Sequence, residues 1–197
     1  MKERHSVRQY KNQVIDHSKR EEINAFVNAI NAESKLAIQV FYDEPKCFDS
    51  FIAHYGKFEN VKNYIAIVGN KNDQEKAGYY GEKIVLKCQK LGLNTCWVAM
   101  THGKSKAQIK RGQKLLIIIS LGYGETQGVP HKSKSMAELS KADENAEWFT
   151  KGMEAVCLAP TAVNQQKFLF ELKNGVVTAK ALMGFYSKTD LGIAKYH

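Results

Sequence analysis

Apolar residues recur at helical spacing in three parts of the chain. The clearest stripe joins Ile23, Phe26, Val27 and Ile30 at i, i+3, i+4 and i+7. Similar stripes predict helices from about residue 73 to 91 and from about residue 145 to 158.

Other apolar segments have the character of strands. Tyr64–Val68 and Leu115–Leu121 are continuous apolar runs, which are typical of strands buried on both faces. Residues 36–42 and 94–100 predict two further strands. Phe168, Phe170 and Leu172 alternate with other side chains and predict a strand with one buried face.

The end of the chain adds a hairpin. Asn174-Gly175 between apolar runs predicts a tight turn into a return strand at 176–179. The order helix-loop-strand then appears twice, near residues 19–42 and 145–172. We therefore expect one α+β domain over residues 1–197, with an internal pseudo-two-fold relating these halves.

Polar residues predict where some helices begin. Ser18 and Glu21 have the spacing of a capping box, which places a helix start at Lys19. A short basic helix is expected from Ser105. Asp190 is expected to cap a short terminal helix.

A turn of small residues lies between the third helix and the strand that begins near Phe168. Pro160 disfavours helical geometry at Ala159, so the helix should end there. Small side chains follow, and then Asn164 and Gln166, whose carboxamides can both donate and accept hydrogen bonds. An ordinary helix-to-strand turn explains this stretch equally well.

The first residues of the chain change that balance. Arg4, Ser6 and Arg8 recur at period two, so an extended arm would direct all three the same way. Two guanidinium groups around a hydroxyl suit a phosphate or a ring that gains negative charge.

Together these stretches resemble the FMN-dependent nitroreductase family, which has an N-terminal R-x-S-x-R/K and an element (A/S)-P-(S/T)-x-x-N-x-Q. They read here as residues 4–8 and 159–166. Residues 92–97, 121–124 and 190–193 look like three further segments of the same family. Two features depart from the usual pattern: the Pro/Asn/Gln element lies near the C-terminus, and Gln166-Lys167 stands where many members have Gln-Pro-Trp. The chain resembles a subgroup with a rearranged or duplicated order.

The resemblance implies a nitroreductase-like fold, with a central, mostly antiparallel sheet flanked by helices, and a set of FMN contacts. Arg8 would lie near the pyrimidine edge of the flavin, and Arg4, Ser6 and a later lysine would lie near its phosphate. Backbone groups at Met100 and Thr101 would face the flavin N5. The full set of implied cofactor contacts is Arg4, His5, Ser6, Arg8, Met100, Thr101, Lys132, Lys134, Pro160, Thr161, Ala162, Asn164 and Gln166.

The formal net charge of +9 raises the alternative of a nucleic-acid-binding domain. The 29 Lys and Arg residues are spread along the chain, however, and no RNA-binding aromatic motif accompanies them. We therefore expect no nucleic-acid partner. The densest basic run is interpreted first as a solvated helix face and second as steering for anionic ligands; it comprises Lys104, Lys106, Lys110, Arg111 and Lys114.

Other features point to the cytoplasm. No apolar run approaches the roughly 18 residues of a membrane span, and the first residues lack the apolar core of a secretory signal. Four cysteines lie scattered among apolar residues, which predicts reduced core thiols. The histidines lack metal-ligand spacing, so no metal site is expected.

The resemblance implies an FMN-dependent NAD(P)H oxidoreductase. Hydride would pass from NAD(P)H through flavin N5 to a small-molecule acceptor in a ping-pong cycle, with no side chain acting as catalyst. A nitroaromatic, a quinone or a flavin would be the acceptor. The protein would be a homodimer, or a monomeric pseudo-dimer that builds the site within one chain. A non-catalytic flavin-binding protein is the main alternative.

Overall fold

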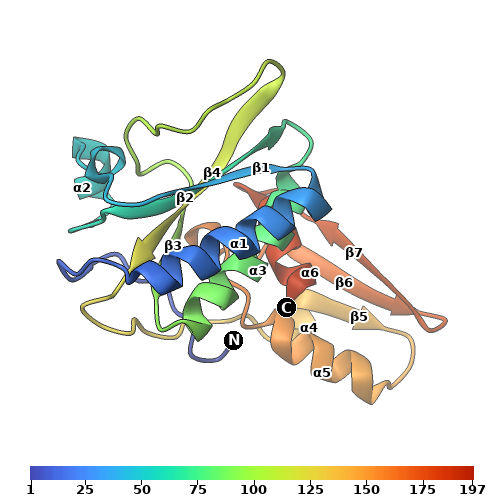
Figure 1. Ribbon diagram of the computed structural model, residues 1–197. Coiled ribbons are helices and arrows are strands. Elements are labelled where there is room, and N and C mark those ends of the chain that lie inside the picture. The colour runs from blue at the N-terminus through green and yellow to red at the C-terminus, as the bar shows by residue number, and fades with distance from the viewer.

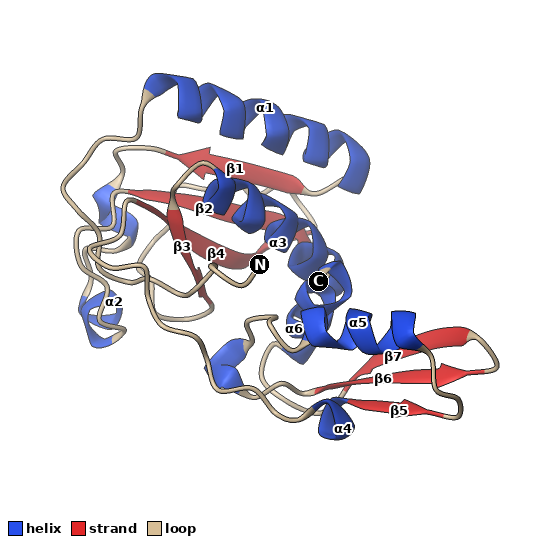
Figure 2. Ribbon diagram, turned by 90° about the horizontal axis from the view of Figure 1, so that it is seen from below, coloured by secondary structure: helices blue, strands red, loops and turns tan.

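The computed structural model describes all 197 residues as two sheets with crossed helices between them. Figure 1 and Figure 2 show the four-stranded sheet on one side, the three-stranded sheet on the other, and α3 and α6 in the middle. The first part of the chain forms, in order, α1 (His17–Ser34), β1 (Ala37–Phe41), the 3-10 helix η1 (Pro45–Cys47), α2 (Phe51–Tyr55), β2 (Asn63–Asn70), α3 (Gln74–Lys90), β3 (Asn94–Val98) and β4 (Gln113–Gly122).

The four-stranded sheet has the order β1-β2-β4-β3, and every neighbouring pair is antiparallel. Successive residues of β2 point to opposite faces. Ile65 and Ile67 pack against α1 and α3, whereas Tyr64 and Ala66 pack against the N-terminal arm and α2. Both faces are therefore covered, as the continuous apolar runs predicted.

The second part of the chain builds a smaller layer. It contains α4 (Met136–Leu139), β5 (Ser140–Ala142), α5 (Glu147–Val156), the 3-10 helix η2 (Ala162–Asn164), β6 (Phe168–Lys173), β7 (Val176–Ala181) and α6 (Ser187–Tyr196). Strand β6 lies between β5, which is parallel to it, and β7, which is antiparallel. Apolar residues of α5 and α6 bury the inner face of β6.

Two glycines allow α3 and α6 to cross at close range. A Cβ on Gly78 would lie 2.0 Å from the carbonyl oxygen of Thr189, and a Cβ on Gly192 would lie 1.9 Å from that of Glu75. Since real side chains cannot approach a carbonyl so closely, the crossing requires glycine at both positions. This contact holds the two parts of the molecule together.

The N-terminal arm is extended along the edge of β3. Ser6 forms an isolated parallel bridge with Thr95, and the Val7 N–H donates to the Thr95 carbonyl at 3.0 Å. The extended geometry predicted for the arm is therefore present.

The α+β class and the central antiparallel sheet are confirmed. The predicted strands appear as β1, β2, β3, β4 and β6, and the predicted hairpin joins β6 to β7 at Asn174-Gly175. Helices and strands do occupy both repeated segments, as α1–β1 and α5–β6, but in different sheets. The internal pseudo-two-fold stays a prediction.

Three predicted helix starts are wrong. Helix α1 begins at His17, and no side chain caps it, because the Asp16 carboxylate at its N-cap instead accepts the Tyr123 hydroxyl. Residues 103–110 form no helix, because the Lys106 N–H donates to the Tyr64 hydroxyl and the Gln108 N–H to Gln39.

The third error concerns α6. Asp190 is the fourth residue of this helix and not its cap, since α6 begins at Ser187. The Asp190 carboxylate is turned towards the loop that follows Pro160. None of the helices has the length and apolar character needed to cross a membrane.

Candidate functional site

A cavity of about 510 Å³ lies where the two parts of the molecule meet. Its walls come from the N-terminal arm, the end of α2, β3 with the turn after it, the loop that begins at Pro160, and α6 with the two residues before it. Ligand sites for small molecules and cofactors commonly enclose roughly 300–1,000 Å³. The cavity is therefore large enough for a cofactor-sized ring system.

Seven of the thirteen predicted cofactor contacts line this cavity. They come from three segments that are far apart in the sequence: Ser6, Arg8, Met100, Thr101, Pro160, Thr161 and Ala162. The packing of α6 against α3 brings the Pro160 loop next to the arm and β3. The tertiary fold thus collects the segments that the family motifs singled out.

Two cations on the cavity wall have no carboxylate partner. Neither Arg8 nor Lys57 takes part in any ion pair, and the Arg8 guanidinium lies 5.8 Å from the centre of the Phe58 ring. Both side chains are exposed. The wall therefore offers positive charge to an anionic or electron-accepting ligand.

Asp190 is the one carboxylate in the cavity lining, and its charge is directed into the protein. Its Oδ1 accepts the Ala162 N–H at 2.9 Å, and its Oδ2 accepts the Gln165 side-chain amide at 2.9 Å. Burial raises the pKa of Asp190 to about 6, against the opposing effect of these two hydrogen bonds. Asp190 fixes the loop to α6.

The loop itself has unusual backbone geometry. Val163, Asn164 and Gln166 have φ angles of 45°, 54° and 44°, which non-glycine residues adopt rarely. Such conformations persist only where surrounding contacts hold them. Asp190 supplies two of these contacts, and the Thr161 hydroxyl supplies another by accepting the Gln166 N–H at 3.1 Å.

The other six predicted contacts do not line the cavity. Four of them join the Pro160 loop to the segment around Lys132. The Asn164 amide donates to the Lys132 carbonyl at 2.8 Å, the Lys134 N–H donates to Gln166 Oε1 at 2.6 Å, and Lys134 Nζ donates to the Gln165 carbonyl at 2.9 Å. His5 is partly buried in the arm. For these residues a role in binding the cofactor stays a prediction.

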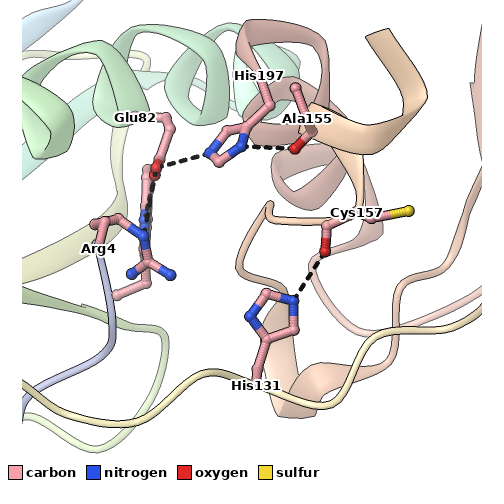
Figure 3. A network of polar contacts seen from close by, with 7 residues as sticks. Arg4, Glu82, His131, Ala155, Cys157 and His197 are labelled. Atoms are coloured by element: carbon pink, nitrogen blue, oxygen red, sulfur yellow. Dashed lines mark hydrogen bonds and ion pairs between the residues drawn. The ribbon is translucent and has the colours of Figure 1, made fainter. Parts of the chain in front are cut away.

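Arg4 belongs to a buried network that the sequence did not reveal. Figure 3 shows its guanidinium beside Glu82 of α3, with His197 on the other side of the same carboxylate. Arg4 Nε lies 3.7 Å and His197 Nε2 lies 3.0 Å from Glu82 Oε1. The Arg4 and Glu82 side chains are 2% and 0% exposed, so the pair is removed from water.

The same carboxylate reaches the cavity wall through Trp97. The Trp97 indole N–H donates to Glu82 Oε2 at 3.0 Å, and Trp97 lines the cavity. Glu82 lies within the apolar stripe of α3, and that placement is the one sequence signal of a buried partner. A charge on the apolar face of a helix requires a counter-charge from elsewhere in the fold.

Arg4 retains unused hydrogen-bonding capacity. Its Nε and Nη1 atoms are buried and have no hydrogen-bond partner, since Nε is too far from Glu82 for a hydrogen bond. Buried donors are rarely left unsatisfied, so such atoms call for an explanation. An anionic group bound at the end of the arm would provide one.

A family model described as "Putative TM nitroreductase" matches residues 1–197 of the chain. Among curated proteins, none matches the chain. The "putative nitroreductase" of Thermotoga maritima has a similar crystal structure, with a TM-score of 0.69 and 22% identity over 99% of this chain and 78% of that chain.

Two further structures share the fold at lower similarity. A "putative nitroreductase" from Desulfovibrio desulfuricans in complex with FMN has a TM-score of 0.53 and 17% identity over 70% of this chain and 90% of that chain. A "putative NADH dehydrogenase/NAD(P)H nitroreductase" from Bacteroides thetaiotaomicron has a TM-score of 0.52 and 18% identity over 69% of this chain and 90% of that chain. These structures establish the nitroreductase fold, and the match of the family model to every residue shows that the chain belongs to this nitroreductase family of oxidoreductases.

Proposed function

We propose that the protein is an FMN-dependent NAD(P)H oxidoreductase that reduces a small-molecule acceptor in the cavity described above. The observation that carries this proposal is the meeting of Ser6 and Arg8, Met100 and Thr101, and Pro160–Ala162 around one cavity. The relative from Desulfovibrio desulfuricans binds FMN on the same fold, which supports the choice of cofactor.

The residues present fit an anionic flavin nucleotide. The cavity combines flat apolar walls, including Trp97 and Pro160, with the hydroxyl groups of Ser6 and Thr101. Arg8 lines the cavity and has no competing carboxylate, whereas Arg4 lies outside the cavity wall and is paired with Glu82. Such a surface can hold a ring system on one side and donate hydrogen bonds to its polar edge.

Bound FMN supplies the redox chemistry itself, and the protein binds, orients and tunes it. Arg8 would stabilise negative charge that develops on the ring, by the same electrostatics that shift a pKa. Pro160, Thr161 and Ala162 would bring backbone close to the ring. Asp190 would hold that backbone in place, with both carboxylate oxygens already occupied by the loop.

The reductant would be NAD(P)H, and a nitroaromatic, a quinone or a flavin would accept the electrons. The names of relatives as NADH dehydrogenase and NAD(P)H nitroreductase support this choice. Positioning of the reactants would account for most of the rate, because hydride transfer between stacked rings needs proximity more than an acid or base. We place this reaction in the cytoplasm, with no membrane or nucleic-acid partner.

The N-terminal arm and the Pro160 loop, which both carry family motifs, meet at one cavity within a single chain. This favours a monomeric pseudo-dimer over a homodimer in which a partner would complete the site. A mass near 22.2 kDa in sedimentation or light scattering is the expected result. A mass near twice that value, with cofactor binding lost on dilution to the monomer, would contradict it.

The proposed function is tested by the visible spectrum of the purified protein, with FMN added if it is colourless, followed by anaerobic NADH or NADPH. A flavin spectrum that bleaches supports an oxidoreductase. A bound flavin that stays yellow with both donors would instead indicate a flavin-binding protein without this turnover. Failure to bind flavin would refute the proposal.

A further inference from the structure

A second hollow lies on the other side of Phe185 and Tyr186. It encloses about 590 Å³ and is lined by three exposed lysines, with Gln74 and Ser187 between them. We call it the lysine groove, after Lys71, Lys114 and Lys188. No carboxylate lines it, and none of the three lysines takes part in an ion pair.

The fold gathers these lysines from three separate elements. Lys114 of β4 is paired with Gly69 of β2, and Lys71 follows two residues later at the same end of the sheet. Lys188 is the second residue of α6. Three like charges kept together without counter-ions repel one another, so their proximity favours an anionic ligand with more than one charge.

Two helix starts reinforce this positive field. Helices α3 and α6 cross near their N-terminal ends, at Gly78 and Thr189, so both first turns lie beside the groove, where Gln74 and Ser187 line it. Neither helix has a side-chain cap. Asp73 stands before α3, but its carboxylate is turned to the Asn70 N–H and to Lys76. Uncapped N–H groups add to the attraction that the lysines exert on phosphate.

The groove adjoins the cavity. Phe185 and Tyr186 line both hollows and form the partition between them. Tyr186 has a φ angle of 51°, and its hydroxyl donates to the carbonyl of Ala99 in the cavity wall at 3.3 Å. A single elongated ligand can therefore place a ring in the cavity and its phosphate groups among the lysines.

We propose, on the basis of the function proposed above, that the lysine groove binds the phosphate groups of the dinucleotide reductant. Its nicotinamide end enters the cavity, and its pyrophosphate and adenosine phosphate lie beyond Phe185. Three lysines suit the larger number of charges on NADPH than on NADH. The groove therefore selects NADPH.

Calorimetric titration of the FMN-loaded protein with 2′,5′-ADP, and with 5′-AMP for comparison, tests the groove directly, because the two ligands differ only in the 2′-phosphate. We expect 2′,5′-ADP to bind more tightly than 5′-AMP, and Lys114→Ala with Lys188→Ala to weaken its binding about tenfold. The same pair of substitutions should raise KM for NADPH by a similar factor, with kcat unchanged. Lys46→Ala with Lys104→Ala removes the same two charges from exposed sites outside the groove and should change none of these values.

Each contrary result has a separate meaning. Unchanged 2′,5′-ADP binding in the double variant, with normal FMN absorbance as proof of folding, would refute the proposal that the groove binds phosphate. Displacement of FMN by 2′,5′-ADP would show that the lysines hold the phosphate of the flavin and would overturn the assignment to the reductant. Binding of 2′,5′-ADP that depends on the lysines, without flavin reduction by either dinucleotide, would refute the proposed function and keep a phosphate site in the groove.

Discussion

The Asp190 carboxylate of α6 accepts the backbone N–H of Ala162 at 2.9 Å. This contact crosses the wall of the cavity and joins the helix that forms its floor to the loop that closes it. Because Val163 and Asn164, which follow Ala162, have left-handed backbone angles, the loop depends on such anchors.

The raised pKa of Asp190 predicts a specific dependence of stability on pH. A carboxyl group with a pKa of about 6 in the folded state and a lower one in the unfolded chain binds more protons when folded between those values. Its contribution to the free energy of unfolding is therefore most favourable at acid pH and is lost as pH rises through about 6. Asp190→Asn removes this titration. Urea unfolding at several pH values measures the free energy of unfolding of both proteins. The value for the wild type minus the value for the variant should fall as the pH rises from about 4 to about 6. A pH-independent difference would contradict the prediction.

Arg8→Ala should weaken FMN binding about tenfold, the loss expected for one charge-assisted contact, and should slow flavin reduction. The reason is the loss of an unpaired cation from the cavity wall. Fluorescence titration with FMN and anaerobic stopped-flow reduction measure the two effects. Lys11→Ala is a matched control, because Lys11 lies in the same arm and is exposed outside the cavity. Equal occupancy and rate in the Arg8 variant would remove this residue from the site.

Glu82→Gln should reduce the free energy of unfolding by about 3–5 kcal/mol, because it leaves the buried Arg4 without its counter-charge. Trp97 loses its carboxylate partner in the same variant, so its fluorescence emission should shift. Glu147→Gln breaks an exposed ion pair with Lys151 and should change stability by no more than about 0.5 kcal/mol. Similar stability losses in the two variants would contradict a buried role for Glu82.

Gly192→Ala should destabilise the protein by about 3 kcal/mol or more, since the new methyl group would overlap the Glu75 carbonyl across the α3–α6 crossing. Gly152→Ala makes the same chemical change inside α5, where nothing lies within 4 Å of the new Cβ. That control should gain roughly 0.5–1 kcal/mol from helix propensity. Thermal unfolding of both variants measures the contrast, and a tolerated Gly192→Ala would mean that the crossing is looser than described.

Local patterns were sufficient to predict most elements of the fold. The apolar stripe of Ile23 to Ile30 specifies a helix because the period of 3.6 residues places those side chains on one face. The continuous run around Ile65 specifies a strand buried on both faces. Asn174-Gly175 specifies the turn between β6 and β7, because these residues tolerate positive φ. Such signals act over a few residues and can be interpreted without knowledge of the rest of the chain.

The tertiary structure decided which of the candidate residues share a site. Arg4 and Arg8 look equivalent in the sequence, yet a carboxylate 78 positions away draws Arg4 into the interior, while Arg8 stays on the cavity wall. Asp190 is a residue type that commonly caps helices, but here it anchors a distant loop. The segment after Ser105 donates its N–H groups to Tyr64 and Gln39, so it does not form a helix. Packing between distant segments decides which partner each hydrogen-bonding group meets. Local sequence patterns cannot specify these partners, because the partners come from distant parts of the chain.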